Sequence, residues 1–288
     1  IGMYSLGSHR KNLTEDQKPK MKRFLLINFL FLFSISLADA QRFSIISYNI
    51  YHGENPTIPG KPTLDTIADY IVLLQPEAIA LQELDSMTLR SATIYGEKIN
   101  QISRISRETG YRGYFGRSMA FEEGAYGNGI LNKKSKGYHT LPLPSPAGGE
   151  PRAVVWSQLE LKTLEEVFMG SVHFDHEFEE NRIAQTDSLF SYADSLSRPA
   201  FIVGDFNFEE GSAAYNRIPS HWKDAGKEAG NLNPTYAGVD GKRIDYLFYD
   251  STYFQLVNYQ VVNLPYSDHY ALLVTLDLIK RRKDPVEK

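Results

Sequence analysis

Residues 201–207 read FIVGDFN, an apolar run that leads through Gly204 into Asp205, Phe206 and Asn207. The apolar residues 201–203 predict a short buried strand. An aspartate directly after a strand commonly accepts hydrogen bonds from the backbone that follows it, in an Asx turn. By itself FIVGDFN therefore indicates a strand and a turn. Its further meaning depends on whether similar polar groups end other strands of the chain.

Five other short polar groups follow or interrupt apolar runs. They are Asn49 in SYNI, Glu83 in LQELD, His173 in GSVHFDH, Asp245 in RIDYLF, and Asp268-His269 in SDH. Taken singly, most have an ordinary explanation as a turn residue, an exposed strand end, a core histidine or a helix cap. Asp245 fits this explanation least well, because a carboxylate between Ile244 and Tyr246 in an apolar strand must be paired if it is buried.

Together these groups form a ligand set that suits one class of metal ion. Oxygen atoms of Asn, Asp and Glu are the ligands that hard divalent cations prefer, and the sequence contains no cysteine. We therefore expect Mg²⁺ as the cofactor, with Mn²⁺ or Ca²⁺ as substitutes, and the number of ions stays open. A zinc hydrolase would need a histidine-rich cluster such as HExxH, which the sequence lacks.

Apolar runs predict many short strands with helices between them. Strands are expected at 43–50, 78–81, 153–161, 167–173, 201–203, 245–248 and 271–276. No linker, repeat or low-complexity tract interrupts the region that contains them. We therefore expect one domain with layered α+β packing.

Helices are predicted where apolar residues recur at helical spacing. One covers about 64–72, a second includes Ile99 and Ile102 and stops near Gly110, and a third covers 179–196. Loops are expected at 53–62 and 141–151, which are rich in Gly and Pro. The aromatic stretch 111–126 is also interpreted as a loop, which could contact a lipid surface, stack on bases or belong to the core.

In their order along the chain, the six polar stretches resemble those of the endonuclease/exonuclease/phosphatase superfamily. That superfamily includes DNase I, exonuclease III, neutral sphingomyelinases and inositol polyphosphate phosphatases. The resemblance covers nearly all of residues 43–277. It implies a four-layer α/β/β/α sandwich, in which two packed, mixed or mostly antiparallel sheets have helices outside. It also implies an active site at one rim, where the loops after the strands meet.

The resemblance implies roles for the oxygen ligands. Glu83, with Asn49 nearby, would bind the metal ion, and Asp268 would contribute to the same or a second metal site. The cation would polarise a phosphoryl oxygen and stabilise the leaving group. Asp205 would orient or deprotonate the attacking water, and Asn207 would help to hold the phosphate.

The resemblance also implies roles for two histidines. His269 would contact the phosphate as a donor, and Asp245 would pair with it, raise its pKa and fix its orientation. His173 resembles the second histidine that DNase I and the sphingomyelinases carry as a donor or acid. The exonuclease III branch lacks this histidine, so its presence points away from abasic-site repair.

Five further residues are weaker candidates for substrate binding. Tyr126 and Asn128 lie in YGNG, which matches a family stretch near the site but also suits a glycine-rich turn. Arg152 in EPRAVV could clamp a phosphate with its fork of donors, or form a surface salt bridge. His52 and His176 follow predicted strands, where both ligands and ordinary polar residues occur.

The first forty residues indicate export. Lys22 and Arg23, the apolar stretch 24–37 and Ala38-Asp39-Ala40 have the three parts of a cleaved signal peptide, which we expect at 21–40. An uncleaved anchor or a buried helix is the alternative. Residues 1–20 would then lie upstream of the true start and be disordered, the catalytic domain would cover 41–280, and 281–288 would form a charged tail. We expect a periplasmic or secreted protein.

Composition narrows the class of substrate. The chain has 288 residues, 42% of them hydrophobic, and its 31 basic and 35 acidic residues give a net charge of -4. Residues 1–40 hold six basic and three acidic residues, so the remainder carries 25 and 32, a net charge of -7. A protein this acidic does not have the basic face that non-specific duplex binding needs. It also has no cysteine, and so no disulfides to harden a secreted nuclease.

These observations favour an exported Mg²⁺-dependent phosphoesterase, expected as a monomer without an obligate protein partner. Its substrate would be a lipid head group or a small organic phosphodiester or phosphomonoester. The alternative within this class is a secreted endonuclease that acts on DNA or RNA. A non-catalytic binding protein on the same fold is the alternative from another class, which the presence of Glu83, Asp205, Asp245 and His269 disfavours.

Overall fold

The structure, a computed structural model, describes residues 41–160 and 166–279. The predicted signal peptide, the residues before it and the predicted charged tail lie outside these ranges. Within the described ranges, none of the helices has the length and apolar character needed to cross a membrane.

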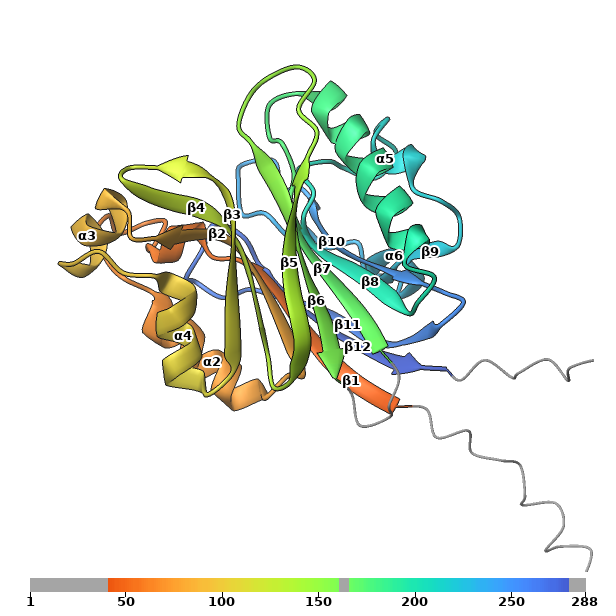
Figure 1. Ribbon diagram of the computed structural model, residues 1–288, viewed down its shortest axis with the longest axis horizontal. Helices are drawn as coiled ribbons and strands as arrows, with labels where there is room; N and C mark the ends of the chain where they lie inside the picture. The colour runs from red at the N-terminus through yellow and green to blue at the C-terminus, as the bar shows by residue number, and fades with distance from the viewer. Residues whose placement is uncertain (1–40, 161–165, 280–288) are drawn as a thin grey trace, which may run out of the picture. The chain divides into compact units, whose positions relative to one another are not determined.

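Two six-stranded sheets form the framework of the domain (Figure 1). The strand order is β11-β12-β1-β2-β4-β3 in the first sheet and β5-β6-β7-β8-β10-β9 in the second. The first sheet contains β1 (Gln41–Asn49), β2 (Ala78–Ser86), β3 (Arg112–Phe121), β4 (Gly124–Asn132), β11 (Phe254–Val262) and β12 (Ala271–Leu278). The second contains β5 (Ser135–Leu143), β6 (Arg152–Glu160), β7 (Glu166–His173), β8 (Ala200–Asp205), β9 (Trp222–Asp224) and β10 (Asp245–Asp250).

Both sheets are mixed, as expected. Strands β1 and β2 run parallel in the first sheet, and β7 and β8 run parallel in the second. The other pairs are antiparallel. In each parallel pair the two strands end at the same edge of the sheet. That edge carries Asn49 and Glu83 in the first sheet, and His173 and Asp205 in the second.

The helices α2 (Leu64–Leu74), α4 (Gln101–Thr109) and α5 (Glu179–Ser195) cover the outer faces of the two sheets. The other helices of the described ranges are α3 (Leu89–Tyr95) and α6 (Ala225–Glu228), with short 3-10 helices at Tyr51–Gly53 and Tyr215–Arg217. Figure 1 shows α2 and α4 beside the first sheet and α5 beside the second. The α/β/β/α sandwich expected from the sequence is therefore confirmed.

Three apolar clusters hold these layers together. Phe43 and Ile45 of β1 pack with Val155 and Phe201 of the second sheet, so this cluster lies between the sheets. Ile46, the next residue of β1, instead packs with residues of α2 and α4. Because side chains alternate between the faces of a strand, β1 needs apolar residues on both. A third cluster joins α5 to the outer face of the second sheet.

The interpretation of 111–126 as a loop is wrong. Most of this stretch forms β3 and the start of β4, which pair as a hairpin around Glu122 and Glu123. Its glycines obscured the strand pattern, because they occupy positions where apolar residues would have revealed an alternation. Gly127, which follows this stretch in β4, is required at its position, since a Cβ atom there would lie 2.0 Å from the carbonyl oxygen of Gly116 in the neighbouring strand.

Other boundaries differ from the prediction by a few residues. The strand β5 continues to Leu143, into the predicted loop 141–151. The helix α4 begins after Ile99, because the side chain of Asn100 caps it by accepting a hydrogen bond from Ser103 N. The strands β5, β9 and β11 and the helices α3 and α6 were not predicted from the sequence.

Candidate active site

Strand register places three of the candidate residues in one row across the second sheet. His173 of β7 lies opposite Asp205 of β8, and Asp205 lies opposite Asp245 of β10. Only 5%, 1% and 2% of these residues, respectively, is exposed. Buried polar groups at this density need specific partners. Because these three residues are buried, they are not ordinary solvent-exposed strand ends. Their burial in one row is typical of a functional site.

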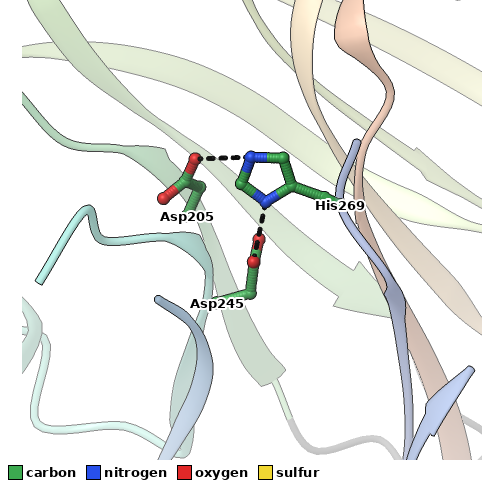
Figure 2. Close-up of side chains that lie close together, drawn as sticks. All are labelled: Asp205, Asp245 and His269. Atoms are coloured by element: carbon green, nitrogen blue, oxygen red, sulfur yellow. Dashed lines mark hydrogen bonds and ion pairs between the residues drawn. The ribbon is translucent and has the colours of Figure 1, made fainter. Parts of the chain in front are cut away.

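His269 pairs with Asp245, as the resemblance implied. The Nδ1 atom of His269 lies 2.8 Å from Oδ2 of Asp245, and its Nε2 atom lies 3.7 Å from Oδ2 of Asp205 (Figure 2). Burial alone would lower the pKa of His269, but the negative charges of Asp245 and Asp205 outweigh burial and raise this pKa to about 10. The imidazole is therefore protonated at neutral pH, and Nδ1–H donates to Asp245.

Asp205 is held by hydrogen bonds to both of its carboxylate oxygens. The backbone N–H of Asn207 donates to Oδ1 at 2.9 Å, which is the Asx turn that the sequence predicts, and Asn49 Nδ2 donates to Oδ2 at 3.0 Å. Burial raises the pKa of Asp205 to about 7, against the charge of His269 and with the help of Asp245. A carboxylate with this pKa can take up a proton near neutral pH.

The first sheet contributes Asn49 and Glu83. A β-bulge between Leu81 and Leu84 interrupts the pairing of β2 with β4, and Glu83 adopts a left-handed conformation there, with φ of 59°. Asn49 Nδ2 donates to Glu83 Oε1 at 3.0 Å, and Asn49 Oδ1 accepts from the backbone N–H of Tyr51 at 3.1 Å.

Glu83 is ionised in this environment. Burial would raise its pKa, but the neighbouring imidazole of His52 and the hydrogen bond from Asn49 hold this pKa well below the usual range. His52 itself lies between two carboxylates, with Nε2 at 3.0 Å from Glu54 and Nδ1 at 3.9 Å from Glu83. His52 is thus a neighbour of the predicted metal ligand Glu83.

Arg152 contacts two of the candidate histidines. Its Nη1 atom lies 3.0 Å from Nδ1 of His173, and its Nη2 atom lies 3.0 Å from Nδ1 of His176. Nη2 also lies 2.8 Å from a carboxylate oxygen of Glu150. The guanidinium is therefore engaged by side chains of the protein. Burial, followed by the charge of Arg152, holds the pKa of His173 well below its usual value.

A cleft of about 630 Å³ connects most of these residues. The candidates that line it are Glu83, Tyr126, Arg152, His173, His176, Asp205, Asn207, Asp268 and His269. Asn49, His52, Asn128 and Asp245 do not line it. Asn49 and Asp245 instead hold residues that line it. Asn49 donates to Glu83 and Asp205, and Asp245 pairs with His269. Asn128 donates to the carbonyl oxygen of Ala153 at 2.9 Å and so links the two sheets.

Some residues of the cleft were not singled out from the sequence. The ring of Tyr236 lies 5.0 Å from that of His269, and Tyr236 and Lys242 both line the cleft. Thr235 Oγ1 accepts hydrogen bonds from the backbone N–H groups of Ile244 and Asp245, and so fixes the start of β10. These residues lie in the loop before RIDYLF, and the turn-forming composition of this loop gave no functional signal.

Comparisons with known proteins agree with this fold. The sequence profile of the Endonuclease/Exonuclease/phosphatase family matches residues 46–269. A family structure from Bacteroides vulgatus is 22% identical, with a TM-score of 0.68, and the match covers 83% of this chain and 99% of that one. No protein of curated function matches the chain significantly.

Two further structures with the same fold are described by an activity or by a protein name. A mannosyl-6-phosphatase of Bacteroides thetaiotaomicron is 20% identical, with a TM-score of 0.66 and coverage of 81% of this chain and 99% of that one. The human Nocturnin catalytic domain with bound sulfate is 18% identical, with a TM-score of 0.66 and coverage of 84% and 95%.

The profile match covers most of the chain and includes all six stretches on which the resemblance depends, from SYNI to SDH. Members of this family hydrolyse phosphoester bonds and generally depend on a divalent metal ion. The described residues also contain a buried cluster of Asp205, Asp245 and His269 with spacing suitable for an ion. The chain belongs to the endonuclease/exonuclease/phosphatase family and is a hydrolase of phosphoester bonds.

Proposed function

We propose that this protein is a Mg²⁺-dependent phosphoesterase that cleaves a phosphodiester, or a phosphomonoester, by attack of water. The observation that carries the proposal is the composition of one cleft. An ionised carboxylate (Glu83), a carboxylate with a pKa of about 7 (Asp205) and a protonated imidazole (His269) all line it. Metal-assisted hydrolysis needs a ligand for the cation, a base for the attacking water and a hydrogen-bond donor to the phosphate.

Glu83 and Asp268 are the carboxylates that we assign to the cation. Both line the cleft, and their oxygen atoms suit Mg²⁺, with Mn²⁺ and Ca²⁺ as the nearest alternatives. The hydrogen bond between His269 and Asp245 engages one potential ligand atom on each, which disfavours the Asp-His cluster as the cation site. A cation bound at Glu83 would polarise a phosphoryl oxygen and stabilise the leaving group.

The donor and acceptor groups suggest how the protein moves protons. Asp205 would orient the attacking water and accept its proton, and the charged His269 would donate from Nε2 to a phosphoryl oxygen. The Nδ2 atom of Asn207 donates to the carbonyl oxygen of Phe174 at 3.0 Å, which fixes this side chain. Asn207 would then help to hold the phosphate. Asn49 would fix the positions of Glu83 and Asp205 relative to each other, since its Nδ2 donates to both.

Charges around the cleft favour a small substrate over a polynucleotide. Besides Glu83, three glutamates line the cleft, each beside a cation: Glu150 with Arg152, Glu179 with Arg182, and Glu209 with Lys242. Among the described residues, each arginine or lysine that lines the cleft is thus paired with a carboxylate, so the cleft offers a nucleic acid no unpaired basic side chains for its phosphates. We therefore place a small organic phosphoester or a lipid head group first, and keep a nuclease as the alternative.

The test uses the purified full chain with Mg²⁺ or with EDTA. Substrates would be an aryl phosphodiester, an aryl phosphomonoester, a hexose 6-phosphate, sphingomyelin vesicles and plasmid DNA. We expect hydrolysis of at least one small phosphoester, lost with EDTA and restored by Mg²⁺. A folded protein that cleaves only DNA would establish the nuclease alternative, and metal-independent turnover would contradict the proposal.

We also infer that the protein is exported, because 21–40 has the pattern of a signal peptide. Expression in a bacterial host, followed by fractionation and N-terminal sequencing, tests this inference. We expect extracellular or periplasmic protein whose first residue is at or near Gln41. Cytoplasmic protein that retains 21–40 would contradict it.

A further inference from the structure

We propose that Arg152 is a positioning residue that fixes the proton of His173 and of His176 on Nε2. The tautomers follow from the geometry alone, whereas their consequence for catalysis rests on the proposed function. Arg152 lies 3.0 Å from the Nδ1 atoms of both rings, through a different terminal nitrogen in each case.

Elementary hydrogen-bond chemistry decides the direction of these two bonds. A guanidinium has five N–H donors, no acceptor, and a pKa too high for it to lose a proton in a protein. Arg152 must therefore donate, and the Nδ1 atoms of His173 and His176 must accept. A ring nitrogen that accepts carries no proton, so each neutral imidazole keeps its proton on Nε2.

The surroundings hold the guanidinium in place. Only 3% of Arg152 and 5% of His173 is exposed, so water does not compete freely for the bond between them, whereas His176 is exposed. Glu150 engages Nη2 from the rim of the cleft, at 2.8 Å. The planar guanidinium can donate to two acceptors that lie in different directions. A lysine ammonium on its flexible stem does not provide this fixed geometry.

The tautomer of His173 determines what that residue can do. Its Nε2 atom lies 3.5 Å from Oδ2 of Asp205, so in this tautomer the ring carries its N–H beside the proposed base. Asn49 Nδ2 donates to the same oxygen. A neutral imidazole keeps its remaining N–H proton, so His173 acts as a hydrogen-bond donor. Of the donor and acid roles that the resemblance implied, the geometry supports the donor.

A spectroscopic test of the tautomers needs no substrate. The full chain, labelled with ¹⁵N at its seven histidines, would give long-range ¹H–¹⁵N correlation spectra at neutral pH, with EDTA present. His173→Gln and His176→Gln assign the two rings. We expect an unprotonated Nδ1 and a protonated Nε2 in each. A proton on Nδ1 of His173, alone or in a doubly protonated ring, would overturn the proposal.

Substitution of Arg152 then tests the cause. In Arg152→Met, which lacks donors, we expect His173 and His176 to lose the single Nε2–H pattern. Arg152→Lys keeps the charge but not the fork, so at most one ring should keep the pattern. Arg217→Met is the matched control, because Arg217 is an exposed arginine paired with Asp187. Unchanged tautomers in Arg152→Met would overturn the proposal.

Kinetics separate positioning from direct phosphate binding. A positioning role predicts a fall in kcat of at least about tenfold in Arg152→Met, similar to the loss of other residues that orient a functional group, with little change in KM. A direct clamp on the substrate phosphate instead predicts a rise in KM and unchanged tautomers, and this result would overturn the proposal.

The two proposals fail in different ways. If the wild-type chain shows the expected tautomers but hydrolyses no phosphoester, the proposed function fails and the assignment of the protons stands. If it hydrolyses a phosphoester but His173 is protonated on Nδ1, the proposed function stands and the role of Arg152 fails.

Discussion

Asp205 and Asp245 lie opposite each other on the antiparallel strands β8 and β10, and both face the imidazole of His269. Two buried carboxylates at neighbouring positions repel each other, and a shared cation relieves this repulsion. The two carboxylates nevertheless differ in their partners. Asp245 is bonded to the charged Nδ1–H of His269, whereas Asp205 faces the cleft and has its pKa raised to about 7.

The substitution Asp245→Asn should lower the pKa of His269 from about 10 toward the usual value of about 6.5. The reason is that it removes the largest charge that raises this pKa. Because His269 must be protonated to donate to the phosphate, activity should fall most on the alkaline side of the pH–rate profile. Histidine NMR titration and kcat/KM against pH measure the two effects.

The control for this substitution is Asp250→Asn at the other end of the same strand, where the carboxylate accepts a hydrogen bond from Thr252 N. It should leave the pKa of His269 unchanged. An unaltered pH–rate profile in Asp245→Asn would contradict the proposed pairing.

Asp205→Asn should abolish turnover while the protein stays folded and binds its metal ion. The same change should make the metal-free protein more stable at pH 8. The folded pKa of Asp205, about 7, lies above its usual value of 3.8, so the wild-type loses stability as pH rises from about 4 to 7. Asparagine does not ionise, and we expect a gain of roughly 1 kcal/mol or more.

Urea unfolding with EDTA at pH 4 and pH 8 measures this stability difference, and hydrolysis of an aryl phosphodiester measures turnover. Asp187→Asn, a substitution of an exposed aspartate paired with Arg217, is the control and should retain activity. Near-normal turnover in Asp205→Asn would remove this carboxylate from the mechanism.

Glu83→Gln should weaken Mg²⁺ binding by more than about tenfold, because a neutral amide replaces a carboxylate ligand held in its charged form. Isothermal titration with Mg²⁺ measures the affinity without any substrate. Glu108→Gln on α4, where Glu108 pairs with Arg104, is the control. An unchanged affinity in Glu83→Gln would shift the cation site toward the Asp205, Asp245 and His269 cluster.

The residues that end strands could be predicted from the sequence for a physical reason. Polar groups such as Asp205 and Glu83 interrupt apolar runs, and a buried strand tolerates such groups only where they have partners. Most of the partners could not be predicted from the residues themselves, whereas the pairing of Asp245 with His269 was implied by the family resemblance. Arg152 and His173 are 21 residues apart and lie on different strands, and only the fold brings them to 3.0 Å. The sequence thus left open whether Arg152 binds substrate or another side chain.

The β3–β4 hairpin was missed because its glycines carry no hydrophobic signal, and the close approach of its two strands is a physical reason for one of these glycines. Gly127→Ala should destabilise the protein by at least about 2 kcal/mol, because its Cβ atom would collide with the backbone of Gly116 at 2.0 Å. Gly137→Ala on β5 is the matched control, because a Cβ atom there has nothing within 4 Å. Urea unfolding with EDTA measures both variants. If the two variants unfold at the same urea concentration, close strand approach is not the reason for glycine at position 127.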